Sequence, residues 1–171
     1  MPGKMLVALI ASALAGCATT GAATVATSGK SAVALADLPP EVIAAAKAFR
    51  PTFEPTEAER EMREGRHYFD VGGTLVDGSE VEFDIMQEGV RWRVVEIQRD
   101  LTLLGIPDAV RAAATRHDAA FAPTRIIESD QTDGIVIYEL FGPKGSDPQG
   151  RKVEIKWDGA KAEVLKKEWA H

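Results

Sequence analysis

Polar and apolar residues alternate in two separate stretches of the chain. Residues 81–85 read Val-Glu-Phe-Asp-Ile, and residues 153–157 read Val-Glu-Ile-Lys-Trp. A period of two is typical of a strand with one buried and one solvent-facing side. We therefore predict a strand at each stretch, with Glu82 and Asp84 on the solvated face of the first.

A different spacing precedes each of these strands. Residues 38–46 read Leu-Pro-Pro-Glu-Val-Ile-Ala-Ala-Ala, and residues 106–114 read Ile-Pro-Asp-Ala-Val-Arg-Ala-Ala-Ala. Apolar residues three and four positions apart predict an amphipathic helix, and proline followed by an acidic residue suits its first turn. We expect the buried helix positions to be Val42, Ile43, Ala46 and Phe49 in one segment and Val110, Ala113 and Ala114 in the other. The motif Phe-x-Pro-Thr then recurs at 53–56 and 121–124, where we expect each helix to end because a residue before proline avoids the α region.

The correspondence between the two segments continues into the strands. Pairs of aligned strands are expected at 66–71 and 135–140, at 81–85 and 153–157, and at 91–97 and 161–169. Asp-Gly and Glu-Gly pairs predict hairpin turns between them. A further strand is expected at 125–128 and, by correspondence, at 57–62, where a helix is the alternative because the residues are Glu-rich.

The fold class predicted by this pattern is α+β. We expect two tandem repeats, 37–101 and 105–169, each a helix packed on a three- to four-stranded antiparallel sheet. A unit of about 65 residues is only marginally stable alone, so the copies are expected to pack together or to continue one sheet. The pattern leaves these two arrangements open.

The N-terminus resembles an export signal. Lys4 precedes an apolar run, and Leu-Ala-Gly stands before Cys17, the only cysteine. Such a run is too short to span a bilayer and is typical of a signal peptide. The residues before Cys17 resemble the lipobox of bacterial lipoproteins, which implies removal of residues 1–16, a lipid on Cys17 and, with Ala18 following, sorting to the outer membrane facing the periplasm. The alternative is an ordinary cleaved signal. Residues 17–36 are mostly Ala, Thr, Gly and Ser with scattered Val and are expected to form a flexible tether, with a short helix at 31–36 as the alternative.

The charge of the chain limits its partners. Lysine and arginine number 20 against 26 aspartates and glutamates, a net charge of −6. Nucleic acid is therefore an unsuitable partner. The basic residues form no polybasic stretch, so we expect membrane attachment to come from the lipid rather than from charge.

A family resemblance rests on four features. They are Leu-Pro-x-x-Val-x-x-Ala at 38–45, a Phe-Pro-like helix end, an aromatic-acidic pair at 69–70 and again at 138–139, and Val-Glu-Phe/Ile before a glycine turn. Together they resemble PepSY-like domains, the β-lactamase-inhibitor-protein-like domains of secreted bacterial proteins. The resemblance implies a helix-backed antiparallel sheet in tandem and binding or inhibition as the usual occupation. The Glu-rich stretch at 57–64 and the long turn at 142–150 depart from the pattern.

The side chains that usually carry catalysis do not form a recognisable motif. His67, His117 and His171 lack metal-ligand spacing, and no serine stands in Gly-x-Ser-x-Gly. Glu82 and Asp84 on one strand face could hold calcium or act as acid and base, but a solvated sheet face is the simpler interpretation. We therefore predict a non-enzymatic protein with no catalytic residue, cofactor or metal.

The strand at 135–141 is apolar on both faces. Its alternate residues Val136, Tyr138 and Leu140 are expected to face the helix, which leaves three apolar residues on the other face, where an antiparallel sheet is usually wet. That face either packs on the other repeat or binds a partner. With the aromatic residues of the first repeat, the candidate binding residues are Tyr68, Trp92, Ile135, Ile137 and Phe141.

These observations predict a lipid-anchored periplasmic binding or inhibitor-type module. Its membrane contact is the lipid on Cys17, and its expected partner is an envelope protein or an exported peptide. The alternatives are a structural lipoprotein of outer-membrane assembly and a calcium- or other metal-binding protein.

Overall fold

A computed structural model describes residues 29–143 and 150–169. The predicted signal peptide 1–16, Cys17 and residues 17–28 lie outside this part of the chain. Within it the elements are β1 (Ser31–Ala32), a 3-10 turn (Leu35–Asp37), α1 (Pro40–Phe49), β2 (Glu54–Arg63), β3 (Arg66–Thr74), β4 (Glu80–Glu88), β5 (Arg91–Leu101), α2 (Asp108–His117), β6 (Arg125–Asp130), β7 (Val136–Phe141), β8 (Lys152–Trp157) and β9 (Ala162–Val164). Neither helix has the length and apolar character needed to cross a membrane.

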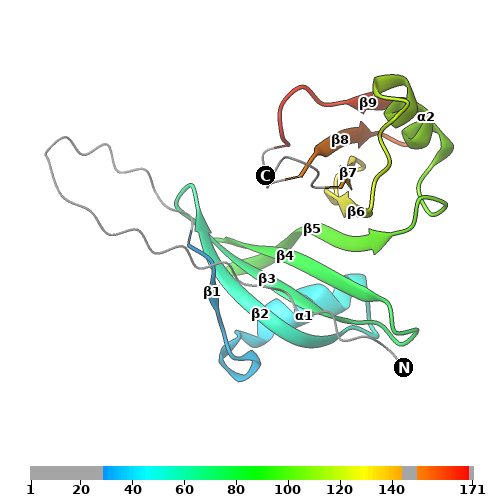
Figure 1. Cartoon of the computed structure of the whole chain (residues 1–171). Coiled ribbons are helices and arrows are strands. Elements are labelled where there is room, and N and C mark those ends of the chain that lie inside the picture. The colour runs from blue at the N-terminus through cyan, green and yellow to red at the C-terminus, as the bar shows by residue number, and fades with distance from the viewer. Residues whose placement is uncertain (1–28, 144–149, 170–171) are drawn as a thin grey trace, which may run out of the picture.

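All nine strands of the described chain belong to one antiparallel sheet in sequence order, β1 to β9. The pairing of β5 with β6 joins the part that contains α1 to the part that contains α2. Figure 1 shows that the sheet bends at this junction, with both helices on the outside of the bend. The predicted α+β class is confirmed, and the two helix-and-strand units continue one sheet.

Each helix begins directly after a proline. The carbonyl oxygen of Pro39 accepts a hydrogen bond from the Val42 N–H at 2.9 Å, and Pro107 does the same for Val110 at 3.0 Å. Val42 and Ala46 are buried as predicted, but Phe49 is 43% exposed and is not part of the core. Helix α1 ends at Phe49, before the expected Phe-x-Pro, because Arg50 precedes Pro51 and is extended.

The recurring phenylalanine after each helix has a packing role. The Phe53 ring is fully buried and meets the Phe83 ring edge-on, with centroids 4.8 Å apart. Glycine is required beneath it, since a Cβ at Gly73 would lie 2.2 Å from the Glu54 carbonyl oxygen and 2.5 Å from the Phe53 ring. The corresponding Cβ at Gly142 would lie 2.5 Å from the Phe121 ring. The repeated Phe and Gly positions therefore form two matching contacts.

The Glu-rich stretch at 57–62 lies in strand β2. This strand pairs with β3 along its whole length, with a bulge between Pro55 and Glu57, and only Ala58 and Glu61 are buried. The helix alternative for 57–62 is wrong, because ladder pairing and the buried Ala58 override the local helix preference of glutamate.

The expected tether, residues 17–36, includes eight residues that belong to the folded structure. Ser31 and Ala32 pair with β2, and the Val33 N–H donates to the Ala58 carbonyl oxygen at 2.9 Å. Residues 29–36 are therefore part of the folded structure. At the other terminus β9 is also shorter than predicted, since the strand expected over 161–169 covers only Ala162–Val164.

Candidate functional site on the concave face of the sheet

The bent sheet has two faces of different character. One face carries the buried apolar residues that pack on α1 and α2. The residues that alternate with them lie on the inside of the bend, which we call the concave face (Figure 1). Its central members are Tyr68, Asp70, Glu82, Asp84, Met86, Glu96, Gln98, Ser129, Ile137, Glu154 and Lys156. No helix of the described residues lies on this face.

Carboxylates from neighbouring strands stand directly opposite one another on the concave face. Asp84 of β4 pairs in register with Asp70 of β3 and with Glu96 of β5, and Asp70 also pairs with Glu59 of β2. Asp70, Asp84 and Glu96 are each at most 5% exposed. Like charges directly opposite destabilise a sheet. The expectation of a solvated face at Asp84 is therefore wrong: the carboxylate is buried among others of the same sign.

Two cations partly offset this repulsion. Arg63 Nη2 donates to Asp84 Oδ2 at 2.7 Å, and Lys30 Nζ lies 2.6 Å from Asp70 Oδ2. The Arg63 guanidinium also lies 4.0 Å from the centre of the Tyr68 ring. Burial first, and then the neighbouring carboxylate, still raises the pKa of both Asp70 and Asp84. Although burial opposes its charge, Lys30 has a raised pKa because of its hydrogen bond with Asp70.

Glu96 carries the polar network from β5 into β6. Its Oε1 accepts hydrogen bonds from Gln98 Nε2 at 3.0 Å, from Gln131 Nε2 at 3.3 Å and from the Ser129 hydroxyl. Gln131 Nε2 also lies 2.7 Å from Ser129 Oγ. The acidic strands are thus linked to the second part of the sheet by amide and hydroxyl groups.

The C-terminal residues join the same network. The Trp169 indole N–H donates to Gln131 Oε1 at 3.0 Å, and the Trp169 backbone N–H donates to Glu154 Oε2 at 2.6 Å. Lys156 Nζ lies 5.1 Å from the centre of the Trp169 ring. Trp169, expected in a strand, instead closes one side of the concave face.

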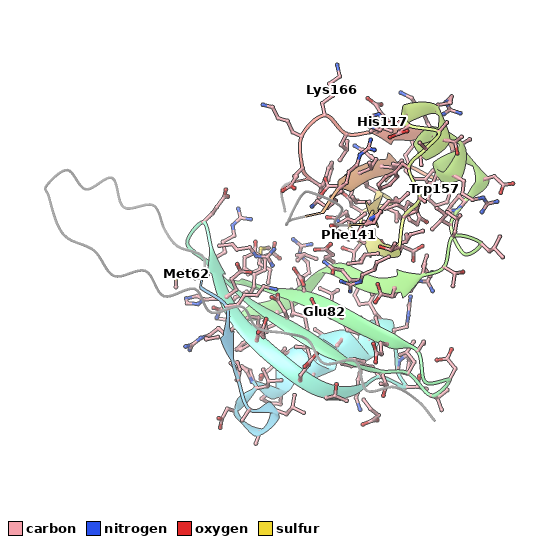
Figure 2. The ribbon with its side chains drawn as sticks, viewed as in Figure 1. Met62, Glu82, His117, Phe141, Trp157 and Lys166 are labelled. Atoms are coloured by element: carbon pink, nitrogen blue, oxygen red, sulfur yellow. The ribbon has the colours of Figure 1, made fainter. Side chains whose placement is uncertain are left out.

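Glu82 is the carboxylate of this face with the clearest change in acidity. Burial, followed by the charge of Asp84, raises its pKa to about 7. Figure 2 shows Glu82 on β4 and Phe141 on β7, both on the inside of the bend. Glu57 and Glu80 lie on the same face and are exposed. This part of the concave face therefore presents acidic groups to solvent.

The structure does not bring the five predicted binding residues together. Tyr68 and Ile137 lie on the concave face but are buried, while Ile135 and Phe141 are half-buried there. Trp92 lies on the helix-covered face, where its ring is 5.0 Å from Phe69. There it lines a shallow cleft of about 200 Å³ with Pro39, Arg60, His67, Phe69 and Gln87. Of the two alternatives left open for this face, packing and partner binding, the burial of Ile137 at 1% exposure favours packing.

The described residues contain no assembled set of metal ligands. No three His, Cys, Asp or Glu side chains come together there in an arrangement that could hold an ion. Glu82 and Asp84 do share a face, but Asp84 already accepts the Arg63 hydrogen bond. His171 lies outside the described residues.

Sequence reasoning missed Lys30, Arg63 and Glu96. Strand register aligns Glu96 with Asp84. Arg63 reaches the buried aspartates from the end of β2, and Lys30 reaches one of them from just before β1. The bulge between Asp84 and Ile85 shifts the alternation of β5 by one residue. No family model matches the chain, and no curated protein or solved structure shows significant similarity to it.

Proposed function

We propose that the protein is a non-catalytic, lipid-anchored binding module of the bacterial cell envelope. Cys17 carries the lipid, the folded part faces the periplasm from the outer membrane, and the concave face receives a basic segment of an envelope protein or exported peptide. The two helix-and-strand units are copies of one PepSY-like unit.

The duplication is supported by matched contacts rather than by similar outlines alone. Pro39 and Pro107 precede the helices in the same way, and the contacts of Phe53 with Gly73 and of Phe121 with Gly142 correspond. These are scaffold positions. We therefore assign the proposed binding to the concave face, where the two copies differ.

The observation that carries the proposal is the acidic part of the concave face. Glu57 of β2 and Glu80 and Glu82 of β4 flank β3 on either side and are at least partly accessible, and the buried carboxylates lie beside them. A complementary charge speeds encounter and selects between partners. An arginine or lysine of a partner would also relieve the repulsion between these carboxylates, which gives binding a direct energetic gain.

The test uses a photo-crosslinking amino acid at Phe141 in the full-length protein in cells. We expect one reproducible adduct whose crosslinked peptide is rich in Lys or Arg. Glu80→Lys should reduce its yield at least tenfold, whereas Glu41→Lys, the same charge change on an exposed position of α1, should not.

No adduct, or an adduct that survives Glu80→Lys, would contradict the proposal. Circular dichroism of each variant shows whether the fold is retained. Ile137→Asp is unsuitable as a test, because a charge at this buried position would report on folding.

A further inference from the structure

One end of the sheet gathers exposed apolar side chains from two hairpins. The turn between β2 and β3 contains Gly65, and the turn between β4 and β5 contains Val90. Strand register places Met62 opposite His67 and Gln87 opposite Trp92 next to these turns. We call residues 60–67 and 87–93 the hairpin end. Met62 is 52% exposed and Val90 is 94% exposed.

The hairpin end is basic in an otherwise acidic chain. It holds five arginines against three glutamates: Arg60, Arg63, Arg66, Arg91 and Arg93 against Glu61, Glu64 and Glu88. Arg63 contacts Glu61 and Arg93 contacts Glu88, whereas Arg60, Arg66 and Arg91 are exposed. The arginines lie in two segments about 30 residues apart, so no polybasic run is visible in the sequence.

The opposite end of the same strands provides a natural contrast. Val76 in the turn between β3 and β4 is 87% exposed, much like Val90. Its charged neighbours are Asp77 and Glu80. The two ends thus expose a valine each but carry opposite charge.

The chain enters the fold at the hairpin end. Strand β1 runs antiparallel to β2 with Ser31 opposite Arg60, so residues before β1 lead toward Met62. Figure 2 shows Met62 at the end of the sheet where β1 begins. Only residues 18–28 separate Cys17 from the described chain, a span of at most about 40 Å even when fully extended.

We propose that the hairpin end docks on the surface of an anionic phospholipid bilayer, with Val90 and Met62 entering the interface and the exposed arginines contacting phosphates. Exposed apolar side chains flanked by basic ones suit such an interface. This inference rests on the proposed lipid anchor at Cys17, and it adds a fixed orientation of the folded part to the tethering.

Tryptophan quenching by brominated phospholipids tests this orientation. The lipidated full-length protein is bound to vesicles of phosphatidylethanolamine and phosphatidylglycerol with brominated acyl chains. One variant keeps Trp92 alone (Trp157→Phe, Trp169→Phe), and its matched counterpart keeps Trp157 alone (Trp92→Phe, Trp169→Phe). We expect quenching of Trp92 at least twofold stronger than that of Trp157, and equal quenching would overturn the docking.

Two turn variants separate docking from anchoring. In the Trp92-only protein, Val90→Asp should reduce the quenching at least twofold, whereas Val76→Asp should leave it unchanged. Vesicle flotation should be retained in both. Flotation without preferential Trp92 quenching overturns the orientation and leaves the anchor standing, whereas loss of flotation in the lipidated parent protein overturns both.

Discussion

The first part of the sheet, β1–β5 with α1, and the second part, β6–β9 with α2, resemble each other on the helix-covered face. They differ on the concave face. At corresponding positions of the predicted copies, Asp84 of β4 is replaced by Lys156 of β8, and Tyr68 of β3 by Ile137 of β7. Within the second part, Lys152 lies 2.7 Å from Glu154 and 3.4 Å from Glu139. Glu139 and Glu154 stand opposite each other there with Lys152 close to both, whereas in the first part Asp70, Asp84 and Glu96 follow one another across three strands. A row of three buried carboxylates across neighbouring strands is therefore found in the first part and not among the described residues of the second.

The first prediction concerns the matched glycines and has the largest effect. Gly73→Ala should lower the free energy of unfolding by about 3 kcal/mol, because the new Cβ meets the rigid Glu54 backbone and the buried Phe53 ring. Gly142→Ala should cost about 1 kcal/mol, because only the half-buried Phe121 ring must shift. Urea denaturation measures the free energy of unfolding of both variants, and equal losses for the two would contradict this prediction.

The second prediction concerns Arg63, which lies beside the buried aspartates of the first part of the sheet. Arg63→Met removes the hydrogen-bonded cation of buried Asp84 and should cost about 2 kcal/mol at pH 8. The loss should be smaller at pH 5, because a carboxyl with a raised pKa can take up a proton and lose its charge. Denaturation at both pH values checks this, and a loss that grows on acidification would contradict it.

The third prediction compares two corresponding glutamates. The pKa of Glu82 is about 7 in the folded protein against 4.5 unfolded, so the folded state binds the proton more tightly and stability falls as pH rises between these values. Glu82→Gln should therefore stabilise the protein by about 1 kcal/mol at pH 8 and be neutral at pH 4.

Glu154→Gln serves as the counterpart. It should destabilise slightly, by under about 1 kcal/mol, because Glu154 pairs with Lys152 and accepts the Trp169 N–H. Thermal unfolding across pH 4–8 separates the two cases. Destabilisation by Glu82→Gln at pH 8 would mean that the carboxylates of the first part support the fold rather than strain it.

The smallest expected effect concerns the C-terminal contact. Trp169→Phe removes one hydrogen bond to Gln131 and should cost about 0.5–1 kcal/mol. Hydrogen exchange of the β6 and β8 amides would show whether the loss stays local, and a global decrease in protection would assign Trp169 a larger role.

Local pattern predicted the elements of this fold well. Alternation at 81–85, the prolines before both helices and the glycine turns all act over a few residues, so they could be interpreted directly. The strand at 57–62 required comparison of the two predicted copies, because its own glutamates favour helix. Phe49 was misassigned to the core: it is the last residue of helix α1 and is 43% exposed.

The concave face could not be derived in the same way. Its burial depends on the bend between β5 and β6, and its carboxylate alignment depends on register across four strands. The bulge after Asp84 set the face of Trp92, and Lys30 and Arg63 reach Asp70 and Asp84 from outside β3 and β4. None of these long-range features produces a recognisable pattern in a short stretch of sequence.

The most direct test of the binding account compares photo-crosslinking from two single positions of the full-length protein in cells. One probe replaces Glu80 on the acidic concave face, and the other replaces Glu41 on the exposed side of α1. A probe without charge leaves Glu57 and Glu82 in place. The account predicts a specific adduct with a basic segment from position 80 and none from position 41. Equal labelling from both positions, or labelling from position 41 alone, would contradict it.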